Sequence, residues 1–173
     1  MKQIAVVGAG KIGEMIVELL STTQDYAVTL IDGSEEQLAR FEPSSKLQTR
    51  QLDVSDVAEL AKVLKGHYAV LSATPYYLTE AIATAAKTAK LHYLDLTEDV
   101  ASTERVKKLA EDAETAFIPQ CGLAPGFISI VANHIAESFD ELQSIRMRVG
   151  ALPQYPSNSL NYNLTWSTDG VIN

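Results

Sequence analysis

Near its start the chain reads Ile4-Ala5-Val6-Val7-Gly8-Ala9-Gly10-Lys11-Ile12-Gly13, a short apolar run that leads directly into a G-x-G-x-x-G motif. Apolar side chains then recur at helical spacing from Ile12 to Leu20, as they do in a helix that packs one face on a core. An apolar run, a glycine-rich turn and a helix, in this order, predict the strand–turn–helix unit with which a parallel α/β sheet begins.

The alternation continues through the first two thirds of the chain. Further short apolar runs, which predict strands, occupy residues 27–31, 47–52, 69–73, 93–96 and 116–118. Helical spacing or alanine-rich sequence, which predicts helices, occupies residues 57–64, 78–89 and 106–113. Six strands that alternate with helices predict an α/β fold, a Rossmann-type doubly wound parallel sheet with right-handed crossovers.

The pattern changes after residue 122. A Gly-Leu-Ala-Pro-Gly stretch at 122–126 interrupts the chain, a helix is predicted for 127–139, and alternating polar and apolar residues at 144–149 predict a strand with one solvated face. One helix and one such strand are too little for a second core. We therefore expect residues 1–122 to form a complete domain and residues 123–173 to be the truncated start of a second, α+β domain.

The composition excludes several classes of protein. The 173 residues include 14 Lys and Arg against 22 Asp and Glu, a net charge of −8, which argues against nucleic acid or an anionic membrane as a partner. No apolar run reaches the roughly 18 residues that span a bilayer, and glycines interrupt the start too soon for a secretory signal. A single cysteine offers no cluster for a metal and suits a reducing compartment, so we expect a cytoplasmic protein.

The placement of the glycine motif predicts a dinucleotide site. Directly after a strand, Gly8 permits a tight turn, Gly10 lets a pyrophosphate approach the backbone, and Gly13 lets the helix pack closely on the strand. The start of the helix, at Lys11 and Ile12, supplies free N–H groups and a partial positive charge for the phosphates. All five residues are therefore candidate cofactor contacts.

An acid at the end of the second predicted strand indicates which dinucleotide is bound. Asp32 stands nineteen residues after Gly13, at the spacing of the acid that binds the adenosine ribose diol. A carboxylate there repels the 2′-phosphate of NADP, so NAD is the favoured cofactor. Lys11 within the loop, and Arg40 one short helix beyond Asp32, keep NADP open as the less favoured alternative.

Two further segments fall at the carboxyl edge of the predicted sheet, where ligands collect in open α/β folds. Asp53 and Val54 follow the third strand and are candidates to flank the adenine; the alternative is a helix start capped by Ser55. The candidates at the end of the fourth strand, whose small side chains let the backbone lie against the nicotinamide ribose, are Ala73, Thr74 and Pro75.

The sequence names no catalytic acid or base. Tyr76, Tyr77, Thr97 and Glu98 follow predicted strands at the same edge, so they are the candidates that this chain offers. None has a spacing that assigns it a role, and the base can lie elsewhere in a longer enzyme.

Several segments resemble the saccharopine dehydrogenase family, which includes saccharopine reductases, lysine 6-dehydrogenases and carboxynorspermidine dehydrogenases. They are residues 5–13, 72–77, 92–98, 165–167 and, most specific, Cys-Gly-Leu-Ala-Pro-Gly at 121–126. The resemblance implies an NAD(P)-dependent oxidoreductase of amino-acid metabolism that moves hydride between nicotinamide and a C–N bond of an amino acid or imine. It also implies that a second domain supplies most substrate contacts and the interface of a homodimer.

The resemblance is incomplete at Ala124, where the family's saccharopine reductases carry an acid. This departure argues against saccharopine as the substrate. It favours a protein that resembles the lysine dehydrogenases or uncharacterised relatives. One alternative is a nucleotide-sensing regulatory domain of the RCK type, which binds NAD(H) without catalysis; another is an enzyme-derived binding protein that kept the cofactor. We expect the chain by itself to be inactive.

Overall fold

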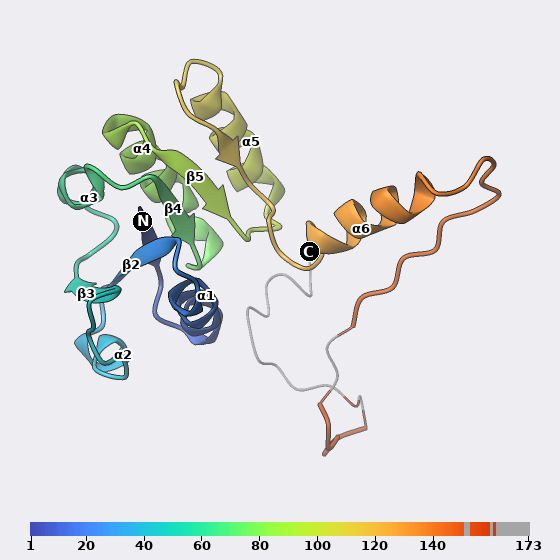
Figure 1. Ribbon diagram of the computed structural model, residues 1–173, viewed down its shortest axis with the longest axis horizontal. Helices are drawn as coiled ribbons and strands as arrows, with labels where there is room; N and C mark the ends of the chain where they lie inside the picture. The colour runs from blue at the N-terminus through green and yellow to red at the C-terminus, as the bar shows by residue number, and fades with distance from the viewer. Residues whose placement is uncertain (151–152, 160, 162–173) are drawn as a thin grey trace. The chain divides into compact units, whose positions relative to one another are not determined.

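The computed structural model describes residues 1–150, 153–159 and 161 (Figure 1). The chain separates into two compact units, Met1–Gln120 and Cys121–Asn173, which are called unit 1 and unit 2 below.

Unit 1 contains a parallel six-stranded sheet with the order β3-β2-β1-β4-β5-β6. This is the doubly wound topology that the alternation of strands and helices predicts, with β1 at the point where the strand order reverses. The strands are β1 (Lys2–Val7), β2 (Tyr26–Asp32), β3 (Leu47–Gln51), β4 (Ala69–Ser72), β5 (His92–Asp95) and β6 (Phe117–Ile118).

Helices cover both faces of this sheet (Figure 1). Along β1, Ile4 and Val6 pack in one apolar cluster with residues of α1 and α2, whereas Ala5 and Val7 pack in another with residues of α3, α4 and α5. Both faces of the central strand are therefore buried, which explains why its sequence is a continuous apolar run. The helices are α1 (Lys11–Thr22), α2 (Glu35–Leu38), α3 (Val57–Leu64), the 3₁₀ helix η1 (Tyr76–Leu78), α4 (Thr79–Ala89) and α5 (Val100–Ala110).

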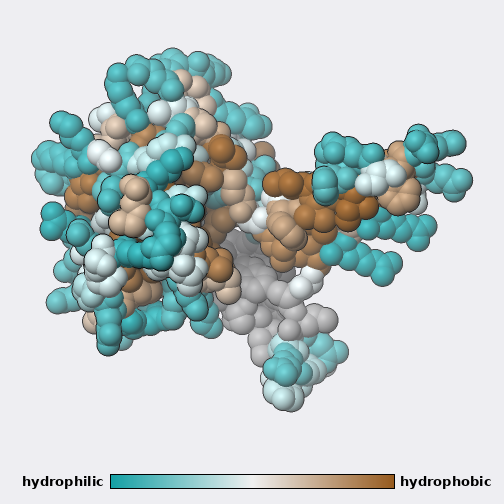
Figure 2. Space-filling view, viewed as in Figure 1, coloured by the Kyte–Doolittle hydropathy of each residue, from teal (hydrophilic) through white to brown (hydrophobic). Residues whose placement is uncertain are grey.

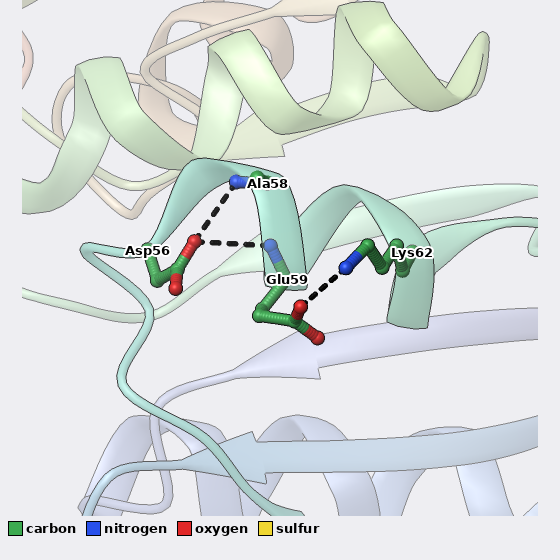
Figure 3. Close-up of polar contacts among 4 residues, drawn as sticks. All are labelled: Asp56, Ala58, Glu59 and Lys62. Atoms are coloured by element: carbon green, nitrogen blue, oxygen red, sulfur yellow. Dashed lines mark hydrogen bonds and ion pairs between the residues drawn. The ribbon is translucent and has the colours of Figure 1, made fainter.

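Polar caps decide where several helices begin. The Asp56 carboxylate accepts the N–H groups of Ala58 and Glu59, both at 3.1 Å, and so caps α3; Lys62 pairs with Glu59 one turn on (Figure 3). The expectation that Ser55 caps this helix is wrong, because the cap lies one residue later. Asp99 caps α5 in the same way, through the N–H of Ser102, which places the helix start well before the apolar stripe that predicted it.

Unit 2 contains α6 (Phe127–Ala136). Large apolar side chains along and just beyond it are exposed, among them Phe127, Ile130 and Phe139, and Figure 2 shows this apolar surface on α6. The predicted strand at residues 144–149 is wrong: these residues form no strand, because a strand requires a hydrogen-bonded neighbour and no described residue pairs with them. The motif at residues 165–167 lies outside the described residues.

None of the helices within the described ranges is long and apolar enough to cross a membrane.

His67 links α3 to the sheet. Its Nδ1 lies 3.1 Å from the carbonyl of Leu64 and its Nε2 lies 3.0 Å from Oγ1 of Thr29 on β2. A carbonyl can only accept, so the neutral ring donates from Nδ1 and accepts at Nε2. Burial lowers the pKa of His67 from its usual value of 6.5, since a charged ring loses its hydration there.

This burial predicts a loss of stability in mild acid. The folded state favours neutral His67, so its contribution is complete above pH 6.5 and falls as the pH drops below that value toward the lower pKa of the folded state. We expect His67→Gln to lower the free energy of unfolding by about 1 kcal/mol near pH 7 and to flatten its dependence on pH. Urea unfolding across this range measures both, with His134→Gln, an exposed position on α6, as the matched control. Equal effects of the two variants contradict the prediction.

Candidate functional site

A cleft of about 270 Å³ opens at the carboxyl ends of β1, β2 and β4 in unit 1. This is the switch point of the sheet, where open α/β folds bind their ligands. Its walls come from the glycine turn after β1, from the ends of β2 and β4, and from the loop after β3. The lining residues are Val7, Gly8, Gly10, Ile31, Asp32, Gly33, Val54, Ala73, Thr74, Pro75 and Leu78.

The first and third glycines of the motif are required by the protein's own backbone. Gly8 has a φ of +105°, and a Cβ there would lie 2.7 Å from the carbonyl oxygen of Ala73. A Cβ on Gly13 would lie only 1.8 Å from the carbonyl oxygen of Gly8. The first turn of α1 therefore packs directly on the turn that follows β1, and only glycine permits that contact.

Gly10 is different, because nothing among the described residues requires it to be glycine. A Cβ built on Gly10 meets no atom within 4 Å, and its φ of −71° and ψ of −173° suit any residue. The space that a side chain would occupy lies at the cleft and at the start of α1. A close approach of a ligand to this backbone explains the glycine.

The N-terminus of α1 faces this space with its donors uncapped. No side-chain cap hydrogen bond is made at Gly10, the cap position of α1; α4 and α6 also lack such a cap, whereas side chains cap α2, α3 and α5. The N–H groups of a first helical turn carry a partial positive charge. Together with the open space at Gly10, they fit the pyrophosphate of a dinucleotide.

Asp32 ties the glycine turn to the end of β2. One carboxylate oxygen accepts the N–H of Ala9 at 2.7 Å and the other accepts the N–H of Ser34 at 2.8 Å. A carboxylate has about four acceptor positions, so two remain for the hydroxyls of a ribose. The half-buried carboxylate thus shapes the cleft and can also bind a ligand in it.

The two cations that keep NADP open do not line the cleft. The Arg40 guanidinium pairs with Glu14 on α1 and donates to Oε1 of Gln37 at 2.7 Å, so two of its five N–H donors are engaged by the protein. Lys11 is exposed on the first turn of α1.

The structure brings together most of the residues that the sequence singles out. Candidate contacts that line the cleft are Gly8, Gly10, Asp32, Val54, Ala73, Thr74 and Pro75, and those that do not line it are Lys11, Ile12, Gly13 and Asp53. Gly13 acts through its contact with Gly8. Four further residues line the cleft without having been predicted as contacts: Val7, Ile31, Gly33 and Leu78.

The Asp53 carboxylate binds within its own turn and does not line the cleft. Its Oδ1 accepts both the N–H of Ser55 at 3.0 Å and the hydroxyl of Ser55 at 2.7 Å, and these bonds hold the pKa of Asp53 below its usual range. Val54, which follows it, is buried at the cleft. Of the two predicted residues, Val54 lines the cleft and Asp53 does not.

The candidate catalytic residues lie on two neighbouring loops at the same edge. Tyr76 and Tyr77 form η1 directly after Pro75, with their rings edge to face at 6.0 Å and with 41% and 70% of their surfaces exposed. Glu98 is exposed on the loop between β5 and α5. These three side chains are accessible to a ligand, whereas Thr97, the fourth candidate, is half-buried and its hydroxyl oxygen accepts the N–H of Asp99 at 3.2 Å. All four follow a strand, β4 or β5, that ends at the cleft side of the sheet.

No His, Cys, Asp or Glu cluster suited to a metal ion occurs within the described ranges.

Comparison with family models identifies a family that this chain matches. The family model described as the saccharopine dehydrogenase NADP binding domain matches residues 4–118. The chain is 24% identical to the mitochondrial alpha-aminoadipic semialdehyde synthase of Mus musculus and 23% identical to the saccharopine dehydrogenase [NADP(+), L-glutamate-forming] of Saccharomyces cerevisiae. Both alignments cover 99% of this chain, but only 19% and 40% of the two relatives.

Solved structures show the same fold. Apo saccharopine dehydrogenase (L-Glu forming) from Saccharomyces cerevisiae matches with a TM-score of 0.69 and 23% identity, over 79% of this chain and 31% of that chain. Pen from Bacillus thuringiensis matches with a TM-score of 0.56 and 14% identity, over 68% of this chain and 49% of that chain. At these identities the likeness extends to the fold alone.

The glycine contacts predict opposite results for two similar substitutions. Gly13→Ala places a methyl group against the carbonyl of Gly8, so we expect the free energy of unfolding to fall by about 2–4 kcal/mol. Gly10→Ala meets open space, so we expect a change of less than about 1 kcal/mol. Urea unfolding of the two variants measures the difference, and comparable losses in both would contradict the packing described for α1.

Proposed function

The chain belongs to the saccharopine dehydrogenase family, as its motifs predict, and from that premise we propose that it is the dinucleotide-binding part of an oxidoreductase acting on a C–N bond of an amino acid or imine. The observation that supports this most directly is Gly10. The fold does not need a glycine there, whereas a pyrophosphate lying on the backbone does.

We propose NAD as the preferred cofactor. The family domain and the yeast relative carry NADP in their names, so the preference rests on this chain's own residues. The Asp32 carboxylate lies at the end of β2, where a 2′-phosphate would meet its negative charge, and Arg40 is engaged by Glu14 and Gln37. The Asp32 carboxylate repels a 2′-phosphate, and none of the described lining residues is a cation that could offset this repulsion. The cleft therefore favours the ribose diol of NAD.

The proposed reaction removes a hydride from the carbon and a proton from the nitrogen of an amine, or returns both to an imine. When bound, the nicotinamide accepts or supplies the hydride. The protein's part is positioning: the first turn of α1 holds the pyrophosphate, Asp32 holds the adenosine ribose, and the segment Ala73–Pro75 lies along the nicotinamide ribose. The proton requires a separate group at the same edge, for which the candidates that this chain offers are Tyr76, Tyr77, Thr97 and Glu98.

The substrate side of the enzyme lies partly outside unit 1. We propose that residues from about 123 onward begin the substrate and dimerisation domain of a cytoplasmic homodimer; the apolar surface of α6 supports a further packing partner there. The relatives' names point to saccharopine or aminoadipic semialdehyde for those proteins. Ala124 supplies no carboxylate in the Gly-Leu-x-Pro-Gly segment, which favours a smaller amine such as lysine.

A nucleotide-sensing domain of the RCK type, without catalysis, is the second candidate. It shares the glycine turn and the acid at the end of β2, so the cleft alone does not separate the two functions. Turnover does.

The role of Asp32 predicts a change in cofactor preference. We expect Asp32→Ala to weaken NADH binding at least about tenfold, since ribose hydrogen bonds to a charged group are lost, and to shift the NADPH-to-NADH affinity ratio toward NADPH. Nicotinamide fluorescence titration of the chain measures both constants. Glu59→Gln, which removes a surface charge of α3 (Figure 3), is the matched control, and an unchanged ratio in Asp32→Ala would refute the assignment.

Turnover tests the enzyme proposal. We expect the full-length product of the gene to reduce NAD with lysine or a related amine as substrate, and Gly10→Ala to lower kcat/KM at least about tenfold because its methyl group occupies the pyrophosphate position. The steady-state rate of NADH formation measures this. NADH binding without turnover of any amine or imine would favour the regulatory domain.

A further inference from the structure

A buried carboxyl group at the end of β5 joins two segments that are far apart in the sequence. Asp95 is 2% exposed. Its Oδ1 accepts the N–H of Thr97 and the N–H of Gln120, both at 3.0 Å, and its Oδ2 accepts the hydroxyl of Tyr93 at 2.8 Å. One side chain therefore satisfies three buried or half-buried donors.

The Gln120 bond lies beyond the end of the sheet. β6 pairs with β5 through Phe117 and Ile118, and Pro119 and Gln120 follow this short ladder. Gln120 has a φ of +62°, a left-handed conformation that residues with a side chain seldom adopt. Asp95 accepts the N–H of this residue, and Gln120 is the last residue of unit 1.

The Thr97 bond holds the other segment. Thr97 begins the loop between β5 and α5 and in turn accepts the N–H of Asp99, the cap of α5, at 3.2 Å. Glu98, a candidate to face the substrate, lies between these two residues. The same oxygen of Asp95 thus sets the loop that carries Glu98 and the point at which the chain leaves unit 1.

Tyr93 donates the third hydrogen bond to Asp95. It is fully buried, and burial, followed by the negative charge of Asp95, raises the pKa of Tyr93 well above its usual range. Tyr93 therefore stays protonated and donates, which orients the carboxyl so that Oδ1 faces both N–H groups.

We propose that Asp95 is a positioning residue that couples the β5–α5 loop to the last residues of unit 1, so that the loop carrying Glu98 and the segment ending at Gln120 open and close together. The coupling follows from the contacts of unit 1; its value to catalysis rests on the proposed function. Asp95 does not line the nucleotide cleft, so its effect falls on the amine substrate and not on the cofactor.

Amide hydrogen exchange of the 173-residue chain tests the coupling. In the wild type we expect the Thr97 and Gln120 amides to share one protection factor within about threefold, because a single opening releases both. Asp95→Ala is expected to lower both at least about tenfold, and Asp95→Asn to restore them, since an amide oxygen still accepts. Tyr93→Phe, which removes the donor that orients the carboxyl, is expected to lower both protection factors together by a smaller amount, and Glu59→Gln on α3 is the control.

Separate exchange of the two amides in the wild type would overturn the proposal, and this measurement stands even where Asp95→Ala does not fold. So would an Asp95→Asn protein that loses as much protection as Asp95→Ala. In the full-length enzyme we expect Asp95→Ala to lower kcat/KM for the amine about tenfold or more with the KM for NAD within about twofold, and Asp95→Asn to restore it. Absence of turnover in the wild type would refute the proposed function and leave the exchange result to decide the coupling.

Discussion

The contact between Gly13 and the carbonyl oxygen of Gly8 is the constraint on which the rest of the site depends. It places the first turn of α1 directly on the turn after β1. From that position the donors at the start of α1 face the cleft, the N–H of Ala9 reaches Asp32, and Glu14 reaches Arg40. A helix displaced by the width of a methyl group would disturb all three contacts, because close-packed backbone has no room to adjust.

Most of the nucleotide-binding fold could be predicted from the sequence, because a strand buried on both faces leaves a continuous apolar run. The glycine motif and Asp32 were also predictable, since their spacing reflects local geometry in one strand–turn–helix unit. Prediction failed where a segment depends on a partner. Residues 144–149 have the alternation of a strand, but pairing decides strand formation, and no described residue pairs with them.

Long-range polar contacts were the second kind of feature that could not be predicted from the sequence. Asp95 and Gln120 are 25 positions apart, and nothing in either residue type identifies the other as its partner. Asp99, which follows β5, caps α5, but the buried carboxyl of Asp95 resembles any other turn-forming acid in the sequence. Only the sheet order, which places β5 beside β6, brings these groups together.

The two outer strands of the sheet bear on how the molecule behaves in concentrated solution. An unpaired strand edge is a template for pairing with another chain. At one edge, β3 presents three exposed polar side chains, Gln48, Arg50 and Gln51, and at the other, β6 has only two residues. A charged edge and a very short one both discourage intermolecular strand addition, so assembly through sheet edges, and the fibrous aggregation that can follow it, is disfavoured for unit 1.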